Sequence, residues 1–488
     1  MNNIFDKLKA YSDSDYYAFH MPGHKRNLDL MDGISPYRID ITEIDGFDDL
    51  HHAEGILRDA QERAARVYHA DETHFLVNGS TVGILSAILG TTEKGDSILV
   101  ARNCHKSVYH AIYLNELDPV YLYPKFDTEQ GLSTEIDAAD VQKALEEHPK
   151  IRAVMIVSPT YDGVVSDIEK IAEIVHAKGC PLIVDEAHGA HFGFDPYFPK
   201  SANIYGADLV INSLHKTLPA LTQTALLHVN GDMVKRRKVK QYLDMLQTSS
   251  PSYILMASID ACIGMLEETL ETHSDTRSDY KYKNIFSEYA NRIEALRKDL
   301  KRLKYLKIIQ TDNTDRYDRS KFVISVKHAP MSSHELYEIL LHRYHLQMEM
   351  LAGTYVLAMT TVGDTQEGLD RLRDALIEID KEIDTRQGRP VAIETDLPLS
   401  GRQPALEKVW TIAEAVNRMD KIQKRSFEDS IGCISVEYAY LYPPGSPLIV
   451  PGERITKEAV EILHWYQEHD FSIEGLQSED GIEVWIDG

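Results

Sequence analysis

Two short apolar runs that end in charged side chains constrain the fold of this chain more than any other feature. Residues 182–184 predict a buried strand that ends at Asp185, and residues 208–212 predict a second strand, followed closely by Lys216. The 31 positions from Asp185 to Lys216 leave room for one crossover and one neighbouring strand. We therefore expect the acid and the lysine at adjacent strand ends, on one edge of a sheet.

An acid and a lysine at adjacent strand ends are the two groups that pyridoxal 5'-phosphate (PLP) needs. The lysine amine forms a Schiff base with the cofactor, and the acid pairs with the pyridinium nitrogen. Either residue alone is more often a partner in an ordinary ion pair. Their order in the chain, together with a phosphate-binding turn upstream, favours a PLP site.

The upstream turn joins a short strand to an apolar helix within residues 75–89. Gly79 allows a close approach of the backbone, and Ser80 and Thr81 stand at the start of the helix. Unpaired N–H groups, hydroxyls and the positive end of the helix dipole make such a turn a seat for phosphate. An isolated Gly-Ser-Thr is more commonly the N-cap of a core helix. Combined with the acid and the lysine, it indicates the phosphate seat of PLP.

Strand and helix patterns alternate through the middle of the chain. Apolar strands are expected at residues 97–101, 120–123 and 153–157, and a helix over 168–178 is followed by Gly179, a residue suited to ending a helix. Near-continuous apolar strands separated by helices predict an α/β fold whose central sheet is mostly parallel and covered on both faces.

Two polar side chains follow strands of this predicted sheet. His105 comes after the strand at 97–101, and Thr160 comes after the strand at 153–157. Both would face the edge where ligands bind. A flat imidazole in that place suits stacking on a cofactor ring, and a histidine in a surface loop is the equally common alternative.

The organisation along the chain predicts four parts. Residues 1–55 are polar, with interleaved aromatic side chains, and predict an N-terminal arm packed against another surface, for example a second subunit. Residues 56–306 predict a large cofactor-binding domain, 307–395 a smaller α/β domain, and 396–488 a C-terminal α+β domain.

The composition excludes several classes of partner. A net charge of −25 argues against nucleic acid and anionic membranes as partners, and it is compatible with a cationic substrate. The four cysteines lie far apart without the spacing of a metal site, so no metal is expected and a reducing cytoplasm is the simplest setting. Residues 1–17 lack the apolar region of a signal peptide, and no run is long enough to span a bilayer.

A series of short motifs spans nearly the whole chain. In order, they are FHMPGHK at 19–25, DDLH at 48–51, NGST at 78–81, RNCHKS at 102–107, PTYDG at 159–163, VDEAHG at 184–189, SLHK at 213–216 and YPPGSP at 442–447. Together they resemble the ornithine/lysine/arginine decarboxylase family of fold-type-I PLP enzymes. The short bacterial arginine/lysine decarboxylases are most similar, since longer members carry an N-terminal wing domain ahead of the His-Met-Pro-Gly-His segment.

The resemblance implies an aspartate-aminotransferase-like fold, a homodimer or higher homo-oligomer with shared active sites, and roles for individual residues. Lys216 would be the Schiff-base lysine, Asp185 the pyridinium partner, and His105 the stacking residue and a candidate proton donor. The remaining cofactor contacts would come from Ser80, Thr81, Ser213 and His215 at the phosphate, His188 near the ring hydroxyl, and Thr248 and Ser249 at the phosphate of the neighbouring subunit.

The implied reaction is the decarboxylation of a basic amino acid, arginine or lysine before ornithine, to an amine and CO₂. A cationic head group in a partly desolvated pocket needs a carboxylate. Glu437 is one candidate, because alternation with its apolar neighbours turns it to the opposite face of a strand, although that face can also be solvent. Asp48 and Asp49 of the arm are the others.

Other classes of protein share parts of this pattern. The α-oxoamine synthases also carry Asp-Glu-Ala-His-Gly, but they usually have a small residue in place of His215 and lack the Tyr-Pro-Pro-Gly segment. An aminotransferase is a further fold-type-I alternative. A helicase, suggested by residues 185–188 alone, would need a phosphate loop of the Gly-x-x-x-x-Gly-Lys type, which this sequence lacks. A zinc site at His188 and His191 is less common than a loop without metal.

Overall fold

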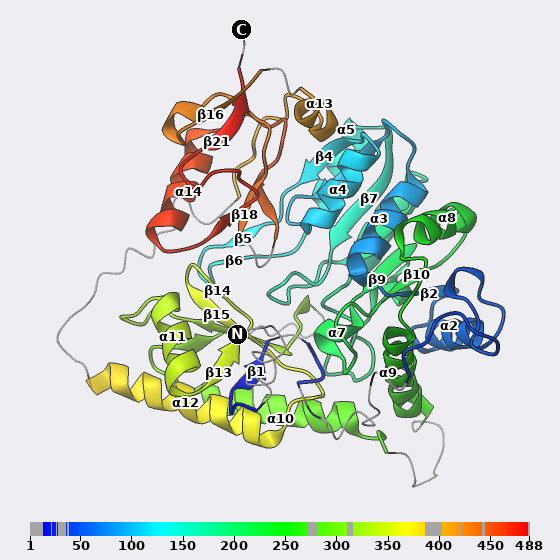
Figure 1. Cartoon of the computed structure of the whole chain (residues 1–488). Helices are drawn as coiled ribbons and strands as arrows, with labels where there is room; N and C mark the ends of the chain where they lie inside the picture. Colours follow the sequence, from blue (N-terminus) through cyan, green and yellow to red (C-terminus); the bar gives the residue numbers. More distant parts are fainter. Residues whose placement is uncertain are drawn as a thin grey trace, which may run out of the picture.

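The computed structural model describes residues 13–20, 22–25, 27, 36, 39–271, 281–309, 316–385, 403–418, 421–441 and 445–486. These residues form a seven-stranded sheet, a four-stranded sheet and two three-stranded sheets, with further two-stranded pairs (Figure 1). The expected boundary at 395/396 and the residues 442–444 of the last motif lie outside the described residues. No helix among the described residues combines the length and apolar composition needed to cross a lipid bilayer.

The seven-stranded central sheet is mostly parallel, as predicted from the sequence. One strand, β10, runs antiparallel to both of its neighbours, and the other pairs are parallel. In spatial order the strands are β2 (Glu72–Leu76), β10 (Ala225–Val229), β9 (Leu209–Asn212), β8 (Leu182–Asp185), β7 (Ile151–Val157), β3 (Ser97–Ala101) and β4 (Asp118–Leu122).

Successive residues of β2 and β10 point to opposite faces of the sheet and pack in two separate hydrophobic cores. The sheet is therefore buried on both faces. Phe75 and Leu226 pack in one core, whereas Leu76 and Leu227 pack in the other. The predicted helix after β7 ends at Ala177 with Lys178 as its C-cap, and Gly179 follows with φ of +71°, a conformation that favours glycine. The surrounding helices are α2 (Ile56–Val67), α3 (Gly79–Thr91), α4 (Lys106–Leu114), α5 (Ala138–Glu147), α6 (Ile168–Ala177), α8 (Arg236–Leu246) and α9 (Tyr253–Glu271).

A smaller antiparallel sheet follows in the chain and lies beside the central one (Figure 1). Its strands are β11 (Lys307–Ile308), β12 (Lys321–Ser325), β15 (Tyr355–Met359) and β14 (Met350–Ala352). The long helices α10 (Ile285–Leu300) and α12 (Gln366–Thr385) lie side by side next to it, and α11 (Ser333–Arg343) begins at Ser332. The Ser332 side chain accepts a hydrogen bond from the Glu335 N–H, as its sequence pattern predicts.

The described part of the N-terminal arm makes contacts within its own chain. Strand β1 (Tyr17–Phe19) pairs in parallel with β13 (Leu346–Met348), and Phe19 is fully buried. The buried Lys25 donates hydrogen bonds to the carbonyls of His20 and Met359, at 2.8 and 2.7 Å. Apolar and ionic groups of the arm are thus buried within the chain, and the expected contact with a second subunit stays a prediction.

The C-terminal part is an α+β unit built from two small sheets. Its elements are β16 (Ile422–Arg425), β21 (Ile482–Trp485) and β17 (Ile434–Ser435), then β19 (Pro447–Ile449), β18 (Ala439–Leu441) and β20 (Ile473–Glu474), with α13 (Ile412–Val416) and α14 (Lys457–Glu468). The fully buried Arg102, just after β3, donates to the carbonyls of Pro447 and Leu448 and to Glu453 Oε2. These bonds hold β19 beside the carboxyl edge of the central sheet.

Candidate active site

A cavity of about 650 Å³ opens at the carboxyl edge of the central sheet. Its walls come from strand ends, from the first turns of α3 and α4, and from the short helix α7 (Leu214–Thr217). The structure thus brings together nine residues that the sequence singled out: Gly79, Ser80, Thr81, His105, Thr160, Asp185, His188, His215 and Lys216.

The N-terminus of α3 forms one end of this cavity. Gly79 has φ of +72° and donates its N–H to the Gln223 carbonyl at 2.9 Å, which turns the chain sharply into the helix. Among the described residues no side chain caps this helix, so the N–H groups that follow that of Gly79 in the first turn are left for another acceptor beside the hydroxyls of Ser80 and Thr81. Such groups are suited to an anion.

Asp185 and Lys216 are buried in the same cavity and are electrostatically coupled. Asp185 ends β8 and accepts a hydrogen bond from the Ala187 N–H at 3.1 Å. Burial raises the pKa of Asp185, which the positive charge of Lys216 opposes. Burial lowers the pKa of Lys216, which the negative charges of Asp185 and Glu349 oppose. The two groups are therefore held as a reactive acid and amine rather than as solvated surface ions.

Two further histidines present uncharged rings to the cavity. His105 is the N-cap of α4 and accepts from the Ser107 N–H through Nδ1 at 3.2 Å. Burial, followed by the charge of Lys216, lowers the pKa of His105 to about 3. His215 donates from Nδ1 to the Thr224 carbonyl at 2.9 Å, and burial lowers its pKa to about 4. Both rings are thus fixed in orientation and neutral at pH 7.

A third histidine, His188, lies between Lys216 and the interior of the protein. The Lys216 Nζ lies 3.0 Å from His188 Nε2, and His188 Nδ1 lies 3.3 Å from the Nζ of Lys321. Nearby His191 is paired with Asp318 at 3.1 Å instead. Within the described residues no group of three or more His, Cys, Asp and Glu side chains is arranged to hold a metal ion.

Three of the predicted cofactor-binding residues do not line the cavity of their own chain. Ser213 is fully buried, and its Oγ has no hydrogen-bond partner within the described residues. Thr248 and Ser249 are exposed in the loop after α8, where the Thr248 carbonyl accepts from His51 Nε2 at 2.9 Å. The structure therefore places these two hydroxyl side chains outside the single-chain cavity.

The three acids predicted to bind the substrate do not line the cavity of this chain within the described residues. Both carboxylate oxygens of the buried Glu437 accept backbone N–H groups, from Gln477 at 2.8 Å and Glu483 at 2.6 Å. Asp48 accepts four backbone N–H groups, and Asp49 caps the short helix Leu50–His52. Each of the three carboxylates accepts at least one backbone N–H group of its own chain.

Several cavity residues were not predicted from the sequence. Ser446 lines the cavity and donates to the Asn103 carbonyl at 2.7 Å, while Gln403 lines it and donates to the Pro447 carbonyl at 2.6 Å. The Tyr-Pro-Pro-Gly motif is a signal that could have indicated Ser446. Nothing in the local sequence indicates Gln403.

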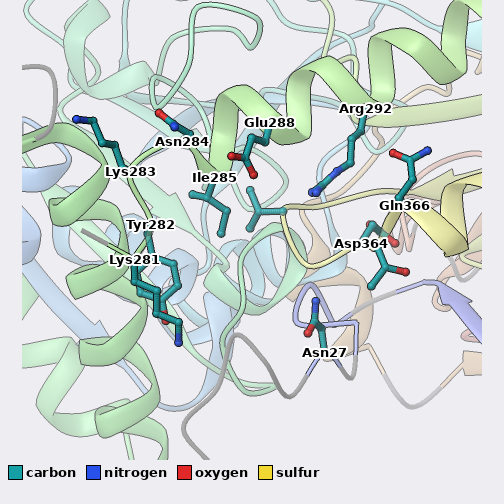
Figure 2. Close-up of a pocket in the computed structure, with 12 residues that line it drawn as sticks. Asn27, Lys281, Tyr282, Lys283, Asn284, Ile285, Glu288, Arg292, Asp364 and Gln366 are labelled. Carbon is teal, nitrogen blue, oxygen red and sulfur yellow. The ribbon is translucent and has the colours of Figure 1, made fainter. Parts of the chain in front are cut away.

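A separate cavity of about 460 Å³ lies between α10 and the loop before α12 (Figure 2). Glu288 and Arg292 project into it from α10, opposite Asp364. Asp364 accepts from the Tyr17 hydroxyl at 3.0 Å and from the Thr361 N–H at 2.7 Å. None of the residues predicted to bind cofactor or substrate is among the described residues that line this cavity.

The fold of this chain is of the fold-type-I class, which its solved structural neighbours share. A solved lysine decarboxylase from Francisella novicida, LdcF, superposes with a TM-score of 0.77 at 19% identity, covering 99% of this chain and 80% of that one. This similarity confirms the predicted fold class.

The family follows from sequence comparison. Residues 2–338 match the profile of the Orn/Lys/Arg decarboxylase major domain, and residues 402–484 match that of its C-terminal domain. An arginine decarboxylase of Bacillus subtilis is 31% identical, covering 94% of this chain and 92% of the relative. The uncharacterized protein YaaO of the same organism is 36% identical, covering 94% and 93%. The chain belongs to the Orn/Lys/Arg decarboxylase family.

Proposed function

We propose that this chain decarboxylates a basic amino acid with the help of PLP, acting on arginine or lysine before ornithine. The observation that carries the proposal is the shared cavity of Asp185, Lys216 and the uncapped N-terminus of α3. Family membership supports decarboxylation of a basic amino acid. The arginine decarboxylase of Bacillus subtilis makes arginine the first substrate to test.

The lining groups fit PLP by their chemistry. The first turn of α3, with Ser80 and Thr81, suits the phosphate. Asp185 suits a protonated ring nitrogen, because burial of the carboxylate is compensated by a positive partner. When bound, PLP would supply an electron sink for the pair released from the bond to the leaving carboxylate.

The chain's own residues would perform four tasks around that group. Lys216 would bond through its amine to the aldehyde carbon and then carry protons within the cavity. Asp185 would hold the ring nitrogen protonated by ion pairing. His105 would cover one face of the ring with a flat, neutral imidazole. Because His105 is such a weak base here, Lys216 is the better carrier of the proton that returns to the substrate carbon.

We further propose a dimer, working in the cytoplasm, in which each subunit completes the other's site. Thr248 and Ser249 are exposed, and a two-fold partner would bring them to the phosphate end of the cavity. Phe47 is 45% exposed and packs edge-to-face on Tyr253 at 6.4 Å, so apolar surface is available next to this loop. The four unpaired cysteines support a reducing compartment.

The test is a set of parallel assays with the purified protein and added PLP. Arginine, lysine and ornithine are supplied separately, and CO₂ and the amine product are quantified. Release of CO₂ with a matching amine, without any acyl-CoA or keto acid, supports the proposal. Transfer of the amino group to a keto acid would instead identify an aminotransferase, and a requirement for acyl-CoA would identify an α-oxoamine synthase. Light scattering measures the assembly, and a fully active monomer would refute the shared site.

A further inference from the structure

Three nitrogen-bearing side chains form a line from the cavity into the interior. Lys216 comes from α7, His188 from the loop after β8, and Lys321 from the first residue of β12. The Nζ of Lys216 is 3.0 Å from His188 Nε2, and the Nζ of Lys321 is 3.3 Å from His188 Nδ1. His188 is 5% exposed and Lys321 is 0% exposed. Lys216 has a role in the proposed reaction, whereas Lys321 has none.

The number of protons that the three side chains share limits their possible charge states. A neutral imidazole has one N–H and one lone pair, and an ammonium group only donates. Two ammonium groups would need lone pairs on both ring nitrogens, which no protonation state of imidazole provides. One of the two lysines must therefore be a neutral amine if both contacts are hydrogen bonds.

The surrounding charges favour Lys321 as the ammonium of the pair. The attraction of Asp318, followed by that of Glu349, opposes the effect of burial at Lys321. Asp318 is fully buried, and its Oδ2 lacks a hydrogen-bond partner within the described residues. Asp185 and Glu349 act on Lys216, but Glu349 acts on both lysines, and the proposed function pairs Asp185 with the cofactor ring. The charged and titratable groups that face the line, among the described residues, are Lys25, His105, Tyr161, Asp162, Asp185, His215, Asp318 and Glu349.

With Lys321 charged, the directions of the hydrogen bonds follow. Lys321 donates to His188 Nδ1, so the single ring proton lies on Nε2 and is donated to the lone pair of Lys216. An amine with a lone pair can attack an aldehyde carbon, whereas an ammonium cannot. The new C=N bond replaces the C=O bond, and the carbonyl oxygen leaves as water with the two amine protons.

We propose that Lys321 is a positioning residue that, through His188, keeps Lys216 in its neutral and nucleophilic form. The inference rests on the proposed function only in taking Lys216 as the lysine that bonds to the cofactor. A packing role does not explain the ammonium group, because burying a charge costs free energy that a methionine of similar length would not cost. Burial, followed by the charges of Lys216 and Lys321, also lowers the pKa of His188 well below its usual range, consistent with a neutral ring.

The test measures Lys216 in the cofactor-free protein. Trinitrobenzenesulfonate labels neutral amines, and mass spectrometry of the Lys216 peptide gives the labelling rate as a function of pH. In Lys321→Met we expect the midpoint to rise by about one unit or more, so labelling at pH 7.5 falls about tenfold. Lys321→Arg keeps a charge and should shift the midpoint less. His188→Phe interrupts the line without removing Lys321, and it should raise the midpoint too.

Lys327 provides a matched control lysine. It lies near the end of β12, where it donates to the Thr128 and Glu129 carbonyls at the surface, and Lys327→Met should leave the midpoint unchanged. Circular dichroism establishes that each variant is folded, and His188→Phe serves as the test if Lys321→Met is not. An unchanged midpoint in a folded variant overturns the role of Lys321. Failure of PLP to attach to Lys216 in the wild-type chain, trapped with borohydride, would instead overturn the proposed function.

Discussion

Two buried clusters of charge in this molecule have opposite character. Around Arg102 one guanidinium meets one carboxylate, that of Glu453, and the remaining bonds go to backbone carbonyls and the Tyr109 hydroxyl. Around Lys216 the like charges of Lys321 and Lys25 lie close enough to influence one another. Opposite charges in contact fix a structure. Burial lowers the pKa of Lys25, Lys216 and Lys321, so their ammonium groups lose a proton more readily than a solvated lysine does.

The two clusters also differ in what they face. The Arg102 cluster is enclosed between the central sheet and β19, and it fastens the C-terminal unit. The Lys216 cluster borders a cavity on one side and the smaller sheet on the other. We therefore expect changes in the first cluster to alter stability and changes in the second to alter chemistry. The following variants test that division, beginning with the largest effect.

Lys216→Ala should abolish covalent attachment of PLP and lower turnover by at least about 10³-fold. Of the two lysines among the described residues that line the cavity, Lys216 is the one whose charge acts on Asp185. Borohydride reduction followed by peptide mapping measures the attachment. Lys424→Ala, at an exposed ion pair of the C-terminal unit, is the control and should keep full attachment. Labelling of another lysine in the wild-type chain would show that the reactive amine has been assigned to the wrong residue.

Asp185→Ala should still bind PLP through the phosphate seat but lose turnover by about 10- to 10³-fold. The estimate comes from the one to three pKa units by which a neighbouring opposite charge shifts a group in such a site. Equilibrium dialysis measures the binding, and product formation measures the turnover. Near-normal turnover in this variant would place the partner of the ring nitrogen elsewhere.

Glu453→Gln should destabilise the chain by about 3–5 kcal/mol, because it leaves the buried guanidinium of Arg102 without its counter-charge. Unfolding in urea, followed by circular dichroism, measures the loss. Glu407→Gln removes the exposed partner of Arg454 and should change little. Attachment of PLP to the folded Glu453→Gln protein should survive. If Glu453→Gln were as stable as wild type, the Arg102 cluster would not have the structural role that separates it from the Lys216 cluster.

The residues that line the cavity were predictable from the sequence, because the carboxyl ends of neighbouring parallel strands lie at the same edge of the sheet. Asp185, Lys216, His105 and Thr160 each follow a strand whose apolar pattern is clear, and all four line one cavity. Lys321 was not predictable, since a lysine at the start of an apolar strand carries no signal that its amine meets a histidine 133 positions earlier in the sequence.

The predicted substrate-binding acids illustrate a different limit of prediction from the sequence. The alternation at Glu437 indicates a face of the chain but not the backbone groups that occupy it. Its carboxylate accepts N–H groups from segments 40 and 46 positions later. Long-range backbone geometry of this kind leaves no periodicity in the sequence, so an acid that satisfies backbone cannot be distinguished there from one that holds a cationic substrate.

Asp48→Asn gives the smallest expected effect and tests the same distinction. Burial alone would raise the pKa of Asp48, but the N–H groups of Asp49, Glu54, Gly55 and Leu57 lower it to about 2. The ionised carboxylate therefore stabilises the fold fully above the unfolded pKa of about 3.9, and the stabilisation is lost as the pH falls through about 2. At pH 7 the variant should lose about 0.5–2 kcal/mol, the usual cost of removing a capping side chain.

Urea unfolding between pH 2 and pH 7 measures the difference in the free energy of unfolding between wild type and Asp48→Asn. This difference should become smaller below pH 4. Glu43→Gln, at an exposed acid of the same segment, is the control and should show no such narrowing. The KM for each basic amino acid should be unchanged, because the Asp48 carboxylate is occupied by backbone donors. A raised KM with unchanged stability would instead assign Asp48 to the substrate, and the arm would then belong with the reactive cluster rather than with the structural one.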